Sequence, residues 1–154
     1  MKRSLKTCVA FASVASLVTA CIGPAAEQAR AAEPRAELSV HDAWARTADS
    51  GATTAVYFTL VNTSATPDTL TAITTAEAEE SGMHMSMQQG TMMRMAAVRA
   101  LPVPGKDSLH FAPLGAHAML MRMRRAVVPG DTVAVTLSFS SGQALEVRAG
   151  VRAR

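Results

Sequence analysis

The sequence predicts an all-β domain of the antiparallel Greek-key sandwich type, and two observations support this fold class. Short segments rich in β-branched and aromatic residues recur about every eight to twelve residues between turn signals. No long stretch shows the apolar period of an amphipathic helix. The 154-residue chain contains no cysteine after position 21, so the core must form without a disulfide framework. Together these features indicate one β-sandwich domain.

The strand pattern is clearest in two segments. In 54–62, the apolar Val56, Phe58 and Leu60 alternate with residues of the other face, and 132–140 alternates in the same way. The predicted strands are 38–46, 54–62, 69–75, 83–87, 91–98, 108–112, 117–123, 132–140 and 144–151, with a helical turn expected at the acidic stretch 77–80.

The start of the chain reads as an export signal. Residues 1–20 combine a basic beginning with the apolar stretch 7–20, which is too short to span a bilayer. Residues 21–37 are rich in Ala, Glu and Pro and lack an apolar period, so a flexible tether is expected there. The predicted domain occupies 38–154.

Two cleavage sites compete. Val18-Thr19-Ala20-Cys21 resembles a bacterial lipobox and directly follows the apolar stretch, whereas Ala29-Arg30-Ala31 would suit a standard signal peptidase. We favour the lipobox, which predicts a periplasmic protein anchored to a membrane through lipidated Cys21. The alternative is a soluble secreted protein that loses both of its cysteines.

The charge distribution argues against nucleic acid or an anionic membrane surface as a partner. The formal charge of +3 comes from Lys2, Arg3 and Lys6, and the remaining twelve basic residues equal the twelve acidic ones. A domain without net charge gives no electrostatic reason for such binding. We therefore expect no nucleic-acid partner, and membrane contact only through the lipid anchor.

Nine of the ten methionines fall between Met83 and Met123, and the first group predicts a β-hairpin. If Gln88 to Thr91 form a four-residue turn, Met87 pairs with Met92 and His84 lies directly opposite Met95. The two side chains would then share a face of the sheet.

A second pair of candidate ligands can be placed without assuming how the strands pair. His117 and Met119 are two apart on one predicted strand, so both side chains point the same way and can reach one ion. We therefore predict a metal site formed by His84, Met95, His117 and Met119. Met85 and Met121 are possible auxiliary ligands.

This donor set selects the metal. Thioether sulfur is soft and uncharged, so it favours Cu(I) over Zn(II), Ca(II) or Mg(II). Blue-copper and iron–sulfur sites need cysteine thiolates, which the domain lacks. A structural zinc site would require cysteine, or several histidines with carboxylates. Cu(I) is therefore the expected ion.

Packing is the competing explanation for the methionines, because Met commonly fills gaps in cores. The combination of two histidines, each surrounded by methionines within one window, favours ligation at the four named residues. His41 and His110 have no methionine nearby and are expected to be structural or exposed. Six further methionines are expected to be core residues, spare thioethers or a landing surface for an ion: Met85, Met87, Met92, Met93, Met121 and Met123.

The spacing resembles that of the periplasmic copper chaperones of the PCuAC type. Their motif is His, ten residues, Met, twenty-one residues, then His-x-Met, and His84, Met95, His117 and Met119 match every interval. The likeness extends over residues 37–148 and includes Asp42 to Arg46, Ala55 to Phe58 with Asn62, and the turn Pro129-Gly130-Asp131.

The resemblance implies a cupredoxin-like sandwich with a Cu(I) site near the surface. It also implies delivery of copper to the CuA centre of cytochrome c oxidase, with a Sco-type thiol protein and the oxidase as acceptors. Many relatives carry a His- and Met-rich C-terminal extension that binds Cu(II). Since the printed sequence ends without one, a second site of that kind is not expected.

Two other classes of function remain open. One is a non-metal interaction module of the cell envelope, or a methionine-based oxidant sink. The other is a copper enzyme, which is disfavoured because the sequence offers no Ser/His/Asp or paired-carboxylate arrangement and no extra histidine for oxygen activation. We expect a binding protein and not an enzyme.

Overall fold

The computed structural model describes residues 36–153, which form ten strands and no helix. The predicted signal segment, Cys21, and the tether up to position 35 lie outside the described residues. The strands are β1 (Leu38–Arg46), β2 (Thr54–Asn62), β3 (Asp68–Thr74), β4 (Ala78–Gln89), β5 (Met92–Val98), β6 (Leu101–Val103), β7 (Asp107–Phe111), β8 (Ala116–Met123), β9 (Thr132–Phe139) and β10 (Ala144–Arg152). The prediction of an all-β fold is confirmed.

Two local predictions are wrong. The acidic stretch 77–80 forms no helical turn, because β4 already begins at Ala78, whose buried side chain anchors the strand to the core. The prediction also lacks β6, a three-residue strand in which the buried Leu101 and Val103 flank Pro102. A strand this short shows too little alternation to be recognised from sequence.

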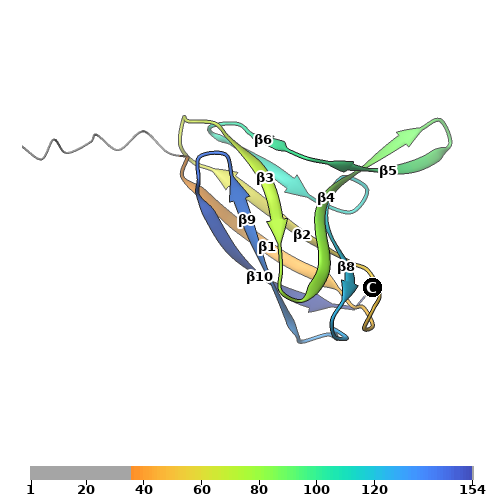
Figure 1. Ribbon diagram of the computed structural model, residues 1–154. Coiled ribbons are helices and arrows are strands. Elements are labelled where there is room, and N and C mark those ends of the chain that lie inside the picture. Colours follow the sequence, from red (N-terminus) through yellow and green to blue (C-terminus); the bar gives the residue numbers. More distant parts are fainter. Residues whose placement is uncertain (1–35, 154) are drawn as a thin grey trace, which may run out of the picture. The chain divides into compact units, whose positions relative to one another are not determined.

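The strands pair in one continuous sheet that folds over on itself. Their order is β5-β4-β8-β7-β2-β1-β10-β9-β3-β6, with a further pairing between β8 and β2. Although β3 and β4 are distant in this order, Ser81 Oγ of β4 donates a hydrogen bond to the Ile73 carbonyl of β3 at 2.8 Å. The β4–β5 hairpin reaches beyond the rest of the sheet (Figure 1).

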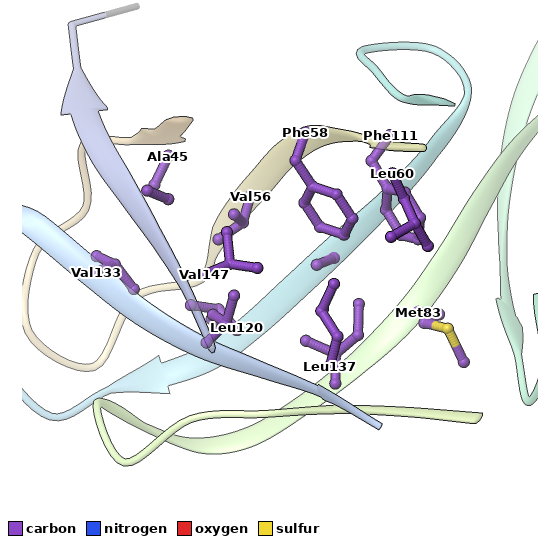
Figure 2. Packing of buried hydrophobic residues seen from close by; sticks show 14 of the residues in the cluster. Ala45, Val56, Phe58, Leu60, Met83, Phe111, Leu120, Val133, Leu137 and Val147 are labelled. Atoms are coloured by element: carbon purple, nitrogen blue, oxygen red, sulfur yellow. The ribbon is translucent and has the colours of Figure 1, made fainter. Parts of the chain in front are cut away.

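The core lies between the two halves of the folded sheet. Val133 and Leu137 of β9 converge with Val56 of β2 and Leu120 of β8, and all four are at most 1 % exposed (Figure 2). Burying side chains of this size contributes about 1.5–3 kcal/mol each. The apolar residues of the alternating segments thus form the core, while the intervening residues of the same strands face outward.

The N-terminal end of the domain is fixed by hydrogen bonds. The carbonyl of the buried Ala36 accepts a bond from Gln143 Nε2 at 2.9 Å, and the Glu37 carbonyl accepts one from the Thr63 amide at 3.0 Å. Ala36 and Glu37 are therefore part of the folded domain. Among residues 36–153, no helix could span a membrane.

Candidate metal centre

The candidate centre lies on the outer face of β2, β8, β4 and β5, which neighbour one another. His117 of β8 pairs directly with His84 of β4, and their ring centroids are 6.1 Å apart. Both side chains lie on the face opposite the core, because the alternate residues Met83 and Ala118 are buried. The two predicted imidazoles therefore meet across neighbouring strands.

The pairing of the β4–β5 hairpin differs from the prediction. The turn is formed by Gly90 and Thr91 alone, so that Gln89 pairs with Met92, Ser86 with Met95 and His84 with Ala97. Gly90 has φ 63°, which a two-residue turn of type II′ requires at its first position.

The expected four-residue turn, and with it the direct pairing of His84 with Met95, is therefore wrong. The shift amounts to two residues, which preserves the face. Met95 lies diagonal to His84 instead of opposite it, at a spacing of about 7–8 Å between Cα atoms, within reach of long side chains.

Met119 occupies a gap between small residues. It pairs with Ala55 of β2 on one side and Gly82 of β4 on the other. A Cβ atom at Gly82 would lie 3.8 Å from Nε2 of His84. This ring nitrogen therefore lies close to Gly82, the residue that pairs with Met119. The absence of a side chain at Gly82 keeps the space between His84 and Met119 open.

Met95, His117 and Met119 line one open pocket of about 310 Å³. The wall also includes Tyr57 and Ser86, and its one charged residue is Arg46. No carboxylate lines this pocket. A cation bound here would find neutral donors and a nearby positive charge, which is more tolerable for a monovalent ion than for a divalent one.

The orientation of His117 is set by the loop between β7 and β8. Its Nδ1 lies 3.0 Å from the Gly115 carbonyl, which can only accept a hydrogen bond. A neutral ring must therefore carry its proton on Nδ1, which leaves the lone pair on Nε2 available to a metal. The same carbonyl accepts a bond from the Ser86 amide of β4 at 3.1 Å, so one peptide group joins both histidine strands.

His84 is held in its neutral form. Burial lowers the pKa of His84 below its usual 6.5, and repulsion by His117 lowers it further. Since only an unprotonated imidazole can donate a lone pair to a metal, this shift extends the pH range in which His84 can act as a ligand.

Aromatic packing supports the other side of His117. Tyr57, which is 5 % exposed, has its ring centroid 6.5 Å from that of His117 and 4.5 Å from that of Trp44. A β-bulge between His41 and Trp44, with Asp42 at φ 53°, brings Trp44 onto the face that Tyr57 occupies.

The other predicted residues are distributed over both faces. Met85 lies on the core face of β4, away from His84, and packs against the core, which does not favour the auxiliary role expected for it. Met121 lies two residues beyond Met119 on β8 and is half-buried. Met83 and Met123 are buried core residues. The large exposed side chains include four hairpin methionines, Met87, Met92, Met93 and Met95.

The remaining histidines have hydroxyl neighbours. His41 Nε2 lies 3.1 Å from Ser39 Oγ, and His110 lies within hydrogen-bond distance of Thr59 and Ser108. Both histidines are exposed.

Four residues that support the site are not evident from the sequence pattern. These are Arg46 and Tyr57 in the pocket wall, Gly82 between two donors, and Gly115 behind His117. The position of Gly115 two residues before His117 is a signal that could have been used, because glycine before a strand often marks a tight loop.

The described residues contain no cluster of the side chains that usually hold harder metal ions. Within residues 36–153, no three His, Cys, Asp or Glu side chains gather in a way that could hold an ion. The face instead carries two imidazoles and two thioethers, of which His117, Met95 and Met119 line the open pocket while His84 lies on the neighbouring strand. Such donors suit a soft monovalent ion.

Solved structures with this architecture include two PCuAC domains. The copper-bound PCuAC domain from PmoF2 superimposes with a TM-score of 0.65 at 21% identity, covering 79% of this chain and 97% of that one. The apo PCuAC domain from PmoF1 gives 0.64 at 22% identity, with 79% and 98% covered. At these identities the likeness concerns the fold, which is that of the PCuAC class.

Sequence relationships define the family. Residues 38–151 match the LpqE-like family, whose description is that of a lipoprotein, and the chain belongs to this family. A relative from Leifsonia xyli subsp. xyli (strain CTCB07), Lxx21020, which is named as a lipoprotein, is 29% identical over 116 residues, covering 75% of this chain and 69% of the relative.

A solved relative carries a copper ion. The solution structure of Cu(I)-DR1885 from Deinococcus radiodurans is 32% identical, with 84% of this chain and 86% of that one covered and a TM-score of 0.57. The resemblance to the PCuAC type is confirmed.

Proposed function

We propose that this protein is an exported metallochaperone that carries one Cu(I) ion on His84, Met95, His117 and Met119. The observation that carries the proposal is that these four side chains share one outer face of β5, β4 and β8, beside a pocket without carboxylates. The Cu(I) bound by DR1885, a relative in the same family, supports the choice of ion.

Selectivity for Cu(I) follows from the neutral donors. Thioethers and unprotonated imidazoles bind a soft ion by polarisation and offer no negative charge to a hard divalent ion. The guanidinium of Arg46 repels a dication twice as strongly as a monocation at the same distance. The site would therefore hold Cu(I) and disfavour its oxidation to Cu(II).

Transfer to an acceptor would proceed by ligand exchange. Met95 is 62 % exposed, so an incoming sulfur can approach the ion on this side while the buried His117 still holds it. A thioether leaves without taking up a proton, and an acceptor thiolate binds Cu(I) more strongly than a thioether does. The direction of transfer is set by the acceptor, and no catalytic group is needed.

The destination implied by the PCuAC resemblance is the CuA centre of cytochrome c oxidase. We propose that a Sco-type thiol protein and the oxidase are the acceptors. Lipidation at Cys21 would keep the chaperone at the membrane surface where such acceptors are anchored, and the lipoprotein description of the family supports this location.

Copper binding is tested on the domain from position 36 onward, loaded anaerobically with Cu(I). X-ray absorption should show two nitrogen and two sulfur neighbours, and competition with a chromophoric chelator should give a stoichiometry of one. A His41→Ala variant serves as a matched control and should behave as the wild type. A copper shell without sulfur would contradict the proposal.

Delivery is tested separately by mixing the Cu(I)-loaded protein with a soluble CuA domain, with and without a reduced Sco-type protein. Copper should leave the chaperone and appear on the acceptor in size-separated fractions. Retention of copper by the chaperone in both mixtures would refute these acceptors while leaving the copper site intact.

A further inference from the structure

The two faces of the β4–β5 hairpin differ in chemistry. The site face, which carries His84, continues toward the tip of the hairpin with Ser86, Gln88, Met93 and Met95. The reverse face carries Met87 paired with Arg94, and Gln89 paired with Met92. Both faces hold exposed thioethers. The one arginine of β4 and β5, Arg94, lies on the reverse face, whereas Arg46 of β1 lies in the wall of the site pocket that Met95 lines.

Met93 is the next thioether outward from Met95. Two residues apart on β5, these side chains point to the same side, at a spacing of about 7 Å between Cα atoms. Met93 pairs with the uncharged Gln88 and is 50 % exposed. From the tip inward, the site face therefore presents Met93, then Met95, then the histidine pair.

Packing does not account for this arrangement. A methionine that fills a gap in the core is buried, as Met83 is at 4 % exposure, whereas Met93 lies half exposed on a hairpin that reaches beyond the sheet (Figure 1). The reverse face is less suited to a cation, because Arg94 pairs with Met87 there and its positive charge would repel a bound cation.

We propose that Met93 is the uptake and release position for Cu(I), which binds the ion transiently and passes it to and from Met95. This inference rests on the proposed function. A copper–sulfur bond to Met93 forms as a bond to the outside donor breaks, and is itself exchanged for the bond to Met95. Copper remains Cu(I) throughout, and no proton moves.

A residue with this role has a distinctive kinetic signature. Because it lowers a barrier that is crossed in both directions, its loss slows loading and unloading by the same factor and leaves the equilibrium affinity unchanged. A permanent ligand behaves differently, because its loss changes the dissociation constant. Rates and affinity together therefore separate a transfer position from a member of the site.

The test compares Met93→Leu with Met92→Leu, since leucine preserves volume and hydrophobicity and the two methionines are neighbours on opposite faces. Stopped-flow absorbance would follow Cu(I) moving from bicinchoninate to the protein and back, and competition would give the affinity. We expect Met93→Leu to slow both rates by about tenfold, the low end of the variation in association rates within one interface. Both rates of Met92→Leu should stay within about twofold of the wild-type rates.

Three results would overturn the proposal: equal rates for Met93→Leu and the wild type, equal slowing by Met92→Leu, or a change in the affinity of Met93→Leu. The first two results would mean that Met93 on the site face has no special role in transfer. The third would mean that Met93 is a permanent ligand of the ion. Failure of the wild type itself to bind Cu(I) would instead refute the proposed function, so the two failures are distinguishable.

Discussion

The four histidines of the domain form two pairs on its outer surface. His84 and His117 are direct partners on β4 and β8, whereas His41 and His110 pair with the same residue, Thr59, from its two sides on β1 and β7. The sheet thus carries two pairs of imidazoles. We call His84 and His117 the inner pair or inner row, and His41 and His110 the outer pair or outer row. What differs is the set of side chains around each pair.

The neighbours decide which ring nitrogens are available. In the outer pair, His110 has Thr59 Oγ1 3.3 Å from Nδ1 and Ser108 Oγ 3.0 Å from Nε2, so hydroxyls engage both nitrogens. In the inner pair, the one hydrogen bond of His117 within the described residues fixes Nδ1 and leaves Nε2 for a ligand. Thioethers distinguish the inner pair, since Met95 and Met119 line one pocket with His117 and no methionine lines the pockets beside His41 and His110, which is why we assign copper to the inner pair.

Replacing a histidine of the inner pair should have the largest effect. We expect His117→Ala to weaken Cu(I) binding by more than about 100-fold, the upper end of the loss seen when only a supporting partner of a metal ligand is removed. Competition with a chromophoric chelator measures this change. His110→Ala is the matched control and should leave the affinity unaltered.

Because His117 is buried, the fold of the variant should be verified by circular dichroism and thermal unfolding. A folded His117→Ala protein with unchanged affinity would remove the inner pair from the site. A loss of affinity in His110→Ala would erase the distinction between the rows.

The thioethers should come next. Met119→Leu removes one of four donors while filling similar space. We expect the Cu(I) affinity to fall by about tenfold, the lower end of the loss caused by removing a residue that supports a metal ligand. Met123→Leu, at a buried core position of the same strand, should change the affinity little. Sulfur neighbours counted by X-ray absorption should fall from two to one only in Met119→Leu.

Acidification should act on the inner pair through His84. Since its pKa in the folded protein lies below 6.5, the unfolded chain takes up this proton first as pH falls. The stability associated with neutral His84 is therefore fully present above pH 6.5 and is lost as pH decreases from 6.5 through the lower folded-state pKa. The free energy of unfolding of the apo domain, measured with urea, should decrease less between pH 7.5 and 5 in His84→Gln than in the wild type. A pH dependence that is the same in both proteins would contradict this assignment.

The sequence predicted the strands and the ligand spacing better than the pairing between strands. Alternation identified segments such as β2, because period-two burial is a local property. The β4–β5 register depended on how many residues the turn used, and Gly90 made a two-residue turn possible where four were expected. The contribution of Gly82 could not be predicted, since it depends on β4 and β8 meeting in the folded chain, whereas the place of Gly115 just before the strand of His117 is a local signal.

The smallest effect is expected from the residue that lies between the outer histidines. Thr59→Val removes the hydroxyl 3.3 Å from His110 Nδ1 but keeps the branched shape that suits a strand. The hydrogen bond is long and exposed, so its loss should cost about 0.5 kcal/mol, the low end for such bonds. Chemical denaturation would measure this value, and the Cu(I) affinity should equal that of the wild type. The second measurement matters more, because weaker copper binding in Thr59→Val would mean that the outer row communicates with the inner one. In that case the contrast between hydroxyl and thioether surroundings could no longer explain which pair of imidazoles serves the ion.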